Sequence, residues 1–133
     1  MSEAVLYLDS SAIIKLVFEE LETSSLSDFL QDWPTRASST VASVEVLRAT
    51  TLVGDDLVTR HARAILTHLH LVRPDDGLLA IAARIEPPLL RALDAIHLAT
   101  ALSLGHDLGG MVVYDRRLAD AARGAGLTFW SPR

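Results

Sequence analysis

The sequence contains no cysteine among its 133 residues and only one lysine, Lys15. The absence of cysteine excludes a disulfide framework and thiolate zinc sites, and it fits a reducing cytoplasm. Any metal ion that this chain binds must therefore be held by oxygen ligands or by imidazole nitrogen.

Long hydrophobic runs are also missing, although 50% of the residues are hydrophobic. No uninterrupted apolar stretch approaches the roughly 20 residues that a bilayer span needs. The N-terminal residues Met1, Ser2 and Glu3 lack the basic start and the apolar core of a signal peptide. We therefore expect a cytoplasmic protein without a membrane segment.

Positive charge is scarce, with 12 lysines and arginines against 17 aspartates and glutamates and a net charge of −5. Binding to a polyanion through overall charge is therefore not expected. If the chain binds nucleic acid, positive charge at the binding site must offset the negative net charge locally. Divalent cations bound to clustered carboxylates would provide it.

Short apolar runs alternate with helical patterns along the chain. The run VLYL at residues 5–8 is apolar at successive positions, which is typical of a strand buried on both faces of a parallel sheet. Strands are expected at 5–8, 35–39 (a strand or a connector), 69–72, 111–114 and 127–130, and helices at about 10–18, 23–32, 40–53, 57–68, 78–85, 89–104 and 116–122. This alternation predicts one α/β domain over residues 1–133, with a mostly parallel central sheet and right-handed crossovers.

Two aspartates directly follow expected strands. Asp9 follows the first strand and Asp115 follows the strand at 111–114. In open α/β sheets, ligands bind outside the carboxyl ends of the strands, so both side chains are expected at one edge. Two further acids, Glu45 and Asp94, lie in the middle of helices that look largely buried, where an ionised carboxylate is costly unless it is paired.

Each of these acids alone also has a structural explanation. Asp9 and Asp115 are favoured helix-capping residues, and an arginine lies three positions from each of the helical acids. Taken together, the four acids are better explained as a cluster, because carboxylates that repel one another need a cation to stay ionised. Magnesium or manganese prefers such oxygen ligands and can orient a phosphodiester for in-line displacement.

Four segments carry a resemblance to a known family. LYLDSSAIIKL, SSTVASVEVLRA, DAIHLATAL and VVYDRRLADAARGAGL resemble the PIN domain, and more narrowly the VapC-type ribonuclease toxins of bacterial toxin–antitoxin pairs. The resemblance implies a three-layer PIN-like α/β fold and a metal-dependent endoribonuclease that cuts tRNA or rRNA and leaves 5′-phosphate and 3′-hydroxyl ends. It also implies that Asp9, Glu45, Asp94 and Asp115 bind one or two Mg²⁺ or Mn²⁺ ions.

The resemblance extends to supporting residues. Ser10 matches a hydroxyl position that supports the site in the family, although helix capping explains it equally well. His97 lies one turn after Asp94, where a structural or substrate-proximal role is expected, and Arg116 is the candidate for an RNA contact. Val113 stands where many relatives have serine or threonine, which removes one supporting hydroxyl.

The resemblance implies partners as well. Members of the family form homodimers and are inhibited by an antitoxin whose C-terminal segment lies across the active site. Five residues are candidates for the antitoxin groove, although core packing is the expected role of each: Leu26, Phe29, Leu30, Trp33 and Leu47.

Two other classes of function compete. A PIN fold that has lost catalysis would leave an RNA-binding or partner-binding module, which the intact set of acids disfavours. Phosphoryl transfer, as in receiver or dehalogenase-like domains, needs a second aspartate near the first or a lysine after a later strand. Asp9 is followed by two serines and Lys15 lies inside the first helix, so this class is disfavoured.

Overall fold

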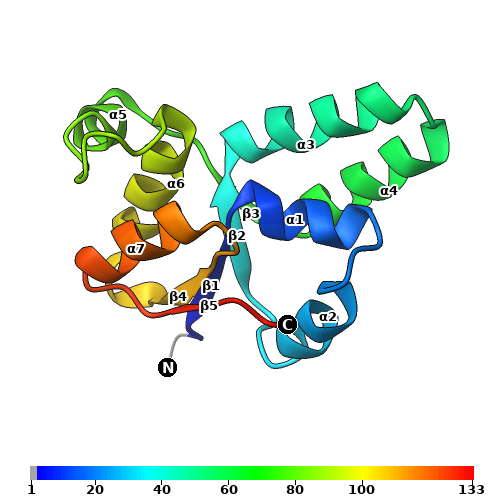
Figure 1. Cartoon of the computed structure of the whole chain (residues 1–133), viewed down its shortest axis with the longest axis horizontal. Coiled ribbons are helices and arrows are strands. Elements are labelled where there is room, and N and C mark those ends of the chain that lie inside the picture. Colours follow the sequence, from blue (N-terminus) through cyan, green and yellow to red (C-terminus); the bar gives the residue numbers. More distant parts are fainter. Residues whose placement is uncertain (1–2) are drawn as a thin grey trace.

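The computed structural model describes residues 3–133, which form one parallel sheet covered by helices on both faces (Figure 1). The strands are β1 (Val5–Leu8), β2 (Arg36–Ser39), β3 (His70–Val72), β4 (Leu108–Val112) and β5 (Phe129–Trp130). The helices are α1 (Ser10–Val17), α2 (Thr23–Leu30), α3 (Thr40–Val53), α4 (Asp56–Thr67), α5 (Asp76–Ala82), α6 (Ala92–Ser103) and α7 (Arg116–Gly124), with a 3-10 turn at Gly105–Asp107. The predicted α/β class and parallel sheet are therefore confirmed.

The strand order β3-β2-β1-β4-β5 places β1 at the centre of the sheet. The chain adds β2 and β3 on one side of β1 and then crosses to add β4 and β5 on the other side. The order therefore reverses between β1 and β4, which pair in parallel with Leu8 opposite Val112. In α/β sheets, the crevice at the carboxyl ends of two such strands is the usual ligand site.

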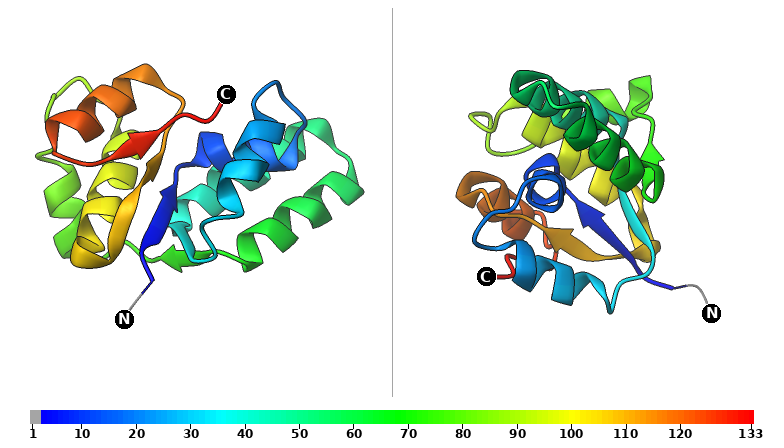
Figure 2. Two further views of the ribbon diagram at one scale, coloured as in Figure 1. Left: turned by 90° about the horizontal axis from the view of Figure 1, so that it is seen from below. Right: turned by 90° about the vertical axis from the view of Figure 1, so that its right-hand side faces the viewer.

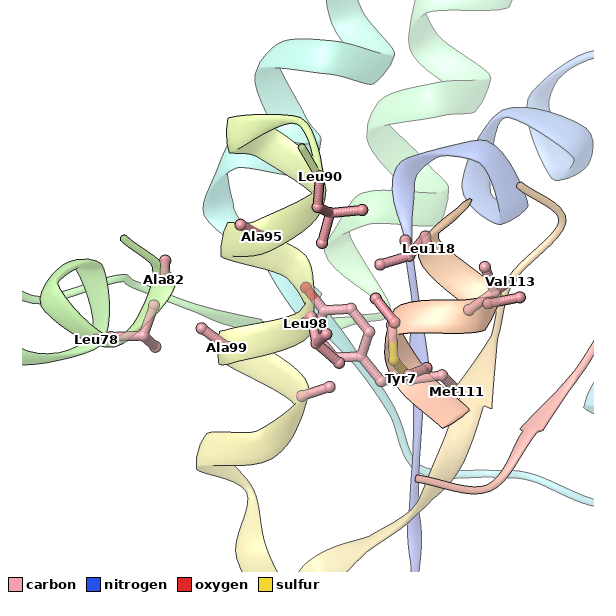
Figure 3. Packing of buried hydrophobic residues seen from close by; sticks show 14 of the residues in the cluster. Tyr7, Leu78, Ala82, Leu90, Ala95, Leu98, Ala99, Met111, Val113 and Leu118 are labelled. Carbon is pink, nitrogen blue, oxygen red and sulfur yellow. The ribbon is translucent and has the colours of Figure 1, made fainter. Parts of the chain in front are cut away.

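The sheet separates two hydrophobic clusters, which gives the molecule three layers. Alternate side chains of β1 point to opposite faces. Leu6 and Leu8 join the cluster under α1 to α4, whereas Tyr7 joins the cluster under α5, α6 and α7. Figure 2 shows the two groups of helices on opposite sides of the strands, and Figure 3 shows Tyr7 reaching from β1 toward α6.

Several element boundaries differ by a few residues from those expected, and two of the differences concern the elements next to Asp94 and Asp115. Helix α6 begins at Ala92 rather than at residue 89, because Pro87 and Pro88 start a turn in which the Leu90 amide donates to the Pro87 carbonyl at 3.0 Å. Leu90 lies in this turn but is only 9% exposed. Its apolar side chain therefore extends the helical pattern of the sequence beyond the start of the helix. Strand β4 runs from Leu108 to Val112, so Val113 and Tyr114 separate it from Asp115.

The early start of β4 has a packing reason. Its residues Gly109 and Gly110 look like a loop signal in the sequence, but each lies under an indole ring. A Cβ atom added to Gly109 would lie 2.5 Å from Trp33, and one added to Gly110 would lie 2.5 Å from Trp130. Glycine is required there because the backbone of β4 passes directly beneath the two rings.

The five candidates for a binding groove pack in the core, as expected for each. Leu26 and Leu30 are buried under the sheet. Phe29, Trp33 and Leu47 are partly buried against the same cluster. The rings of Phe29, Trp33 and Trp130 lie 5.3 to 6.3 Å apart and attach α2 to β5.

Within residues 3–133, no helix combines the length and the apolar character that crossing a bilayer would require.

Candidate active site

Asp9 stands at the end of β1 and caps α1. Its Oδ1 atom accepts a hydrogen bond from the Ala12 amide at 3.0 Å. The Ser11 hydroxyl donates to the same carboxylate, at 2.8 Å from Oδ1 and 3.0 Å from Oδ2. The capping role is therefore real, and it fixes the carboxylate at the carboxyl end of β1.

Burial distinguishes Asp9 from an ordinary capping aspartate. The residue is 4% exposed, whereas Asp55 and Asp75, which cap α4 and α5, are exposed. Desolvation by burial, with a small contribution from the charge of Asp94, raises the pKa of Asp9 to about 6, against the lowering effect of its hydrogen bonds and of His97. An ionised Asp9 carboxylate is therefore short of compensating positive charge.

Asp94 lies in the first turn of α6, close enough to Asp9 for their charges to interact. Its Oδ2 atom accepts from the Arg91 guanidinium at 3.1 Å, which confirms the expected i,i+3 pair. The arginine side chain is 71% exposed and the aspartate side chain 16%, so the pair lies at the rim of the molecule. Such an exposed pair is weak, and it leaves the second oxygen of Asp94 for other ligands.

Glu45 reaches the same region from α3 and is held by His97 of α6. The Nε2 atom of His97 lies 2.8 Å from Glu45 Oε1, and its Nδ1 atom lies 2.7 Å from the Tyr7 hydroxyl. Burial raises the pKa of Glu45, but the hydrogen bond and charge of His97, with the Ser10 hydroxyl, outweigh it and lower the pKa overall. Glu45 is paired with a histidine rather than with Arg48, which the sequence offered as an alternative partner.

The two serines after Asp9 serve different acids. Ser10 is the first residue of α1, and Asp9 provides the cap, so the alternative that Ser10 caps the helix is wrong. The Ser10 hydroxyl instead helps to lower the pKa of Glu45. Ser11, which the sequence reading did not assign to the site, holds Asp9.

Asp115 follows β4 and caps α7. Its Oδ2 atom accepts from the Leu118 amide at 2.9 Å, and the side chain is half-buried. Arg116 is the first residue of α7 and is exposed. Because Asp9 and Asp115 follow neighbouring parallel strands, both lie at the carboxyl edge of the sheet.

The donor chemistry of this edge fits a hard divalent cation. It offers carboxylate oxygens of Asp9, Asp94, Glu45 and Asp115, and the charge of Asp9 is poorly compensated. The side chains are not already arranged as a metal centre, since within residues 3–133 no three acidic, histidine or cysteine side chains meet closely enough to hold an ion. The charges of Asp9 and Asp94 interact, and Glu45 is hydrogen-bonded to His97.

Sequence reasoning missed Tyr7 and Ser11. Tyr7 looks like one more apolar residue of a buried strand, and its partner His97 lies 90 positions away. No local pattern reports such a contact. Ser11 did carry a local signal, because a hydroxyl two positions after a capping aspartate can turn back to its carboxylate.

Comparison with known proteins gives consistent results. The family model described as the PIN domain matches residues 6–124. Ribonuclease VapC46 of Mycobacterium tuberculosis is 44% identical over 129 residues, which cover 97% of this chain and 98% of that protein. Ribonuclease VapC47 of the same species is 35% identical over 132 residues, covering 96% of this chain and 97% of that protein.

Solved structures share the fold at much lower identity. A toxin–antitoxin complex from Klebsiella pneumoniae contains a chain that superposes with a TM-score of 0.75 at 18% identity, covering 96% of this chain and 98% of that chain. VapC20 of Mycobacterium tuberculosis, a sarcin–ricin-loop-cleaving toxin, gives a TM-score of 0.68 at 16% identity, covering 92% and 96%. The family match over most of the sequence and the relatives above 30% identity show that this chain belongs to the PIN domain family and, within it, to the VapC ribonucleases.

Proposed function

We propose that the protein is a metal-dependent endoribonuclease toxin whose site is formed by Asp9, Glu45, Asp94 and Asp115. The observation that carries the proposal is the environment of Asp9. Its carboxylate is nearly buried and interacts with the charge of Asp94, and burial raises the pKa of Asp9 to about 6. Such a group is stabilised at neutral pH by a nearby cation, and hard divalent ions prefer oxygen ligands. The names of the VapC ribonucleases that it resembles support RNA as the substrate.

The ion would be Mg²⁺ or Mn²⁺, held by Asp9 and Asp94 with Glu45 and Asp115 as further ligands. Its chemistry would be to offset charge on the scissile phosphate and to activate water. Residues of the chain prepare the site: Ser11 and the Ala12 amide orient Asp9, and His97 orients Glu45. Arg116, exposed beside Asp115, would contact the RNA backbone and help a protein of net charge −5 to hold a polyanion.

Cleavage of RNA by the purified chain tests the proposal. Mn²⁺ or Mg²⁺ should support cutting of tRNA or rRNA fragments, and EDTA should stop it. Asp9→Asn should reduce the rate about 100-fold or more, since several kcal/mol of charge stabilisation is lost. Asp55→Asn is the control, because Asp55 also caps a helix through its side chain but is exposed and stands at the start of α4.

The outcome against the proposal is equally specific. RNA that stays intact over a wide range of metal concentrations and RNA sequences would leave a catalytically inactive RNA-binding or partner-binding module. Equal loss of activity in Asp9→Asn and Asp55→Asn would assign the effect to capping rather than to the site.

Partners follow from the same proposal. An antitoxin protein that inhibits cutting is supported by the Klebsiella pneumoniae relative, which was solved as a toxin–antitoxin complex.

A homodimer is supported by large apolar side chains that are at least 71% exposed, namely Leu21, Leu52, Leu57 and Leu89. Sedimentation of the purified chain should give twice the monomer mass of 14.4 kDa, and a monomer at micromolar concentration would contradict the dimer. The proposed location is the cytoplasm, where the RNA substrates are.

A further inference from the structure

A chain of hydrogen bonds crosses the core from the central strand to the candidate site. It begins at the Tyr7 hydroxyl on β1, passes through the imidazole of His97 on α6 and ends at Glu45 Oε1 on α3, with distances of 2.7 and 2.8 Å. Tyr7 is 0% exposed and His97 is 1% exposed. Three elements that are far apart in the sequence are therefore linked by hydrogen bonds that run from the interior to the partly exposed Glu45 carboxylate.

The two neighbours of His97 restrict which ring nitrogen can donate and which can accept. Burial raises the pKa of Tyr7 well above its usual value, so its oxygen keeps the proton and can donate it. The Glu45 carboxylate, whose pKa is lowered, only accepts. In its neutral form, His97 satisfies both neighbours in one tautomer alone, with Nδ1 accepting from Tyr7 and Nε2–H donating to Glu45.

Packing alone explains this arrangement poorly. A leucine at position 97 would fill the space without the need to satisfy two ring nitrogens in the interior. The imidazole stands edge-on to the Tyr7 ring, with centroids 5.9 Å apart and planes at 70°, so the two rings also restrict each other's rotation. The Glu45 side chain is 24% exposed, and the hydrogen bond from the buried His97 restricts its rotamer.

We infer that Tyr7 and His97 are positioning residues that hold the Glu45 carboxylate in the orientation in which it receives a divalent cation. Tyr7 acts by selecting the His97 tautomer that donates from Nε2, and His97 acts on Glu45 directly. The inference rests on the proposed metal site and adds to it two residues that need not touch metal or RNA. Outer-sphere partners of this kind commonly change metal affinity 10- to 100-fold.

Substitutions at position 97 can separate the two hydrogen bonds. Glutamine places its amide group near the position of Nε2, so His97→Gln keeps the donor to Glu45 and loses the contact with Tyr7. Asparagine places it near Nδ1, so His97→Asn keeps the Tyr7 contact and loses Glu45. His97→Leu loses both, and Tyr7→Phe removes only the hydroxyl that selects the tautomer.

The measurement is Mn²⁺ affinity of the full chain, by calorimetry or by electron paramagnetic resonance of free Mn²⁺. We expect His97→Leu and His97→Asn to bind Mn²⁺ about 10- to 100-fold more weakly than wild type, and His97→Gln and Tyr7→Phe to fall between. The control is Thr50→Val, which removes a buried hydroxyl from α3, the helix of Glu45, outside the chain of bonds. It should leave Mn²⁺ affinity unchanged even if it lowers the melting temperature.

A second measurement keeps the inference testable if a variant does not fold. In the metal-free wild type, long-range proton–nitrogen NMR spectra should show a protonated Nε2 and a bare Nδ1 for His97. The opposite tautomer would overturn the inference, as would equal Mn²⁺ affinity in wild type and a folded His97→Asn. Wild type that binds no Mn²⁺ at all would instead contradict the proposed metal site, so the two failures are distinguishable.

Discussion

At the scale of single residues, Asp9 makes stability depend on pH in an unusual direction. Burial raises its pKa from 3.8 to about 6, so between these values the folded chain binds more protons at Asp9 than the unfolded chain does. The contribution of Asp9 to stability is therefore highest in acid and is lost as the pH rises through about 6. The full difference is on the order of 2–3 kcal/mol.

Asp9→Asn should remove this dependence. Without metal at pH 7.5, the free energy of unfolding of the variant should exceed that of wild type by about 1–3 kcal/mol, so the variant should unfold at a higher denaturant concentration. This difference in stability should vanish near pH 4. Asparagine is as good a cap as aspartate, so loss of the cap should not hide the effect. Urea unfolding at several pH values measures it, with Asp55→Asn as the exposed counterpart. A difference between wild type and Asp9→Asn that stays constant with pH would contradict the raised pKa.

Two arginine–aspartate ion pairs with the same i,i+3 spacing and the same distance differ in their surroundings. Arg91 and Asp94 form an i,i+3 pair at 3.1 Å, and so do Asp120 and Arg123 on α7. Asp94 interacts with Asp9, whereas the Asp120 side chain is 62% exposed. Asp94→Asn should therefore reduce RNA cleavage about 100-fold or more, while Asp120→Asn should leave it unchanged. Full activity of a folded Asp94→Asn protein would remove Asp94 from the site.

At the scale of secondary-structure elements, β4 depends on two residues without side chains. A Cβ atom on Gly110 would meet Trp130 at 2.5 Å and the backbone oxygen of Thr128 at 2.9 Å. The indole ring could shift, but the backbone of the adjacent strand could not do so cheaply. Gly110→Ala should therefore destabilise the protein by about 1–3 kcal/mol.

Gly124→Ala provides the control for this prediction. Gly124 is the last residue of α7 and has no atom within 4 Å of its added Cβ. Alanine is the better helix former by up to about 1 kcal/mol, so this variant should be as stable as wild type or slightly more so. Thermal unfolding of both variants compares them. If Gly110→Ala melts no lower than Gly124→Ala, β4 does not need the close approach of Trp130.

The same elements show what sequence can and cannot predict. Strand β1 and the helix capped by Asp9 followed from local signals, because an apolar run and a capping side chain act within a few residues. The start of β4 did not, because Gly109 and Gly110 read as a break until Trp33 and Trp130 cover them. The Tyr7–His97 contact was equally out of reach, since it depends on how α6 lies across the sheet.

At the scale of the whole molecule, the acidic residues at the carboxyl edge of the sheet link metal binding to folding. A cation that binds the folded chain and not the unfolded chain stabilises it by mass action, by about 2.7 kcal/mol at 100 times the dissociation constant. For a domain of this size, that corresponds to a rise in melting temperature of about 10 °C. The net charge of −5 adds to this stabilisation, because a bound cation reduces the repulsion among acidic groups of the folded chain.

The size of this stabilisation should depend on pH, because protons compete with the metal for Asp9. Its pKa of about 6 means that Mn²⁺ must displace a proton at pH 5 but not at pH 7.5. We therefore expect Mn²⁺ to raise the melting temperature strongly at pH 7.5 and much less at pH 5, and EDTA to reverse the rise. Asp9→Asn should lose most of the response at both pH values, whereas Asp55→Asn should keep it. A wild-type response that is the same at pH 5 and pH 7.5 would mean that the ion binds elsewhere than at Asp9.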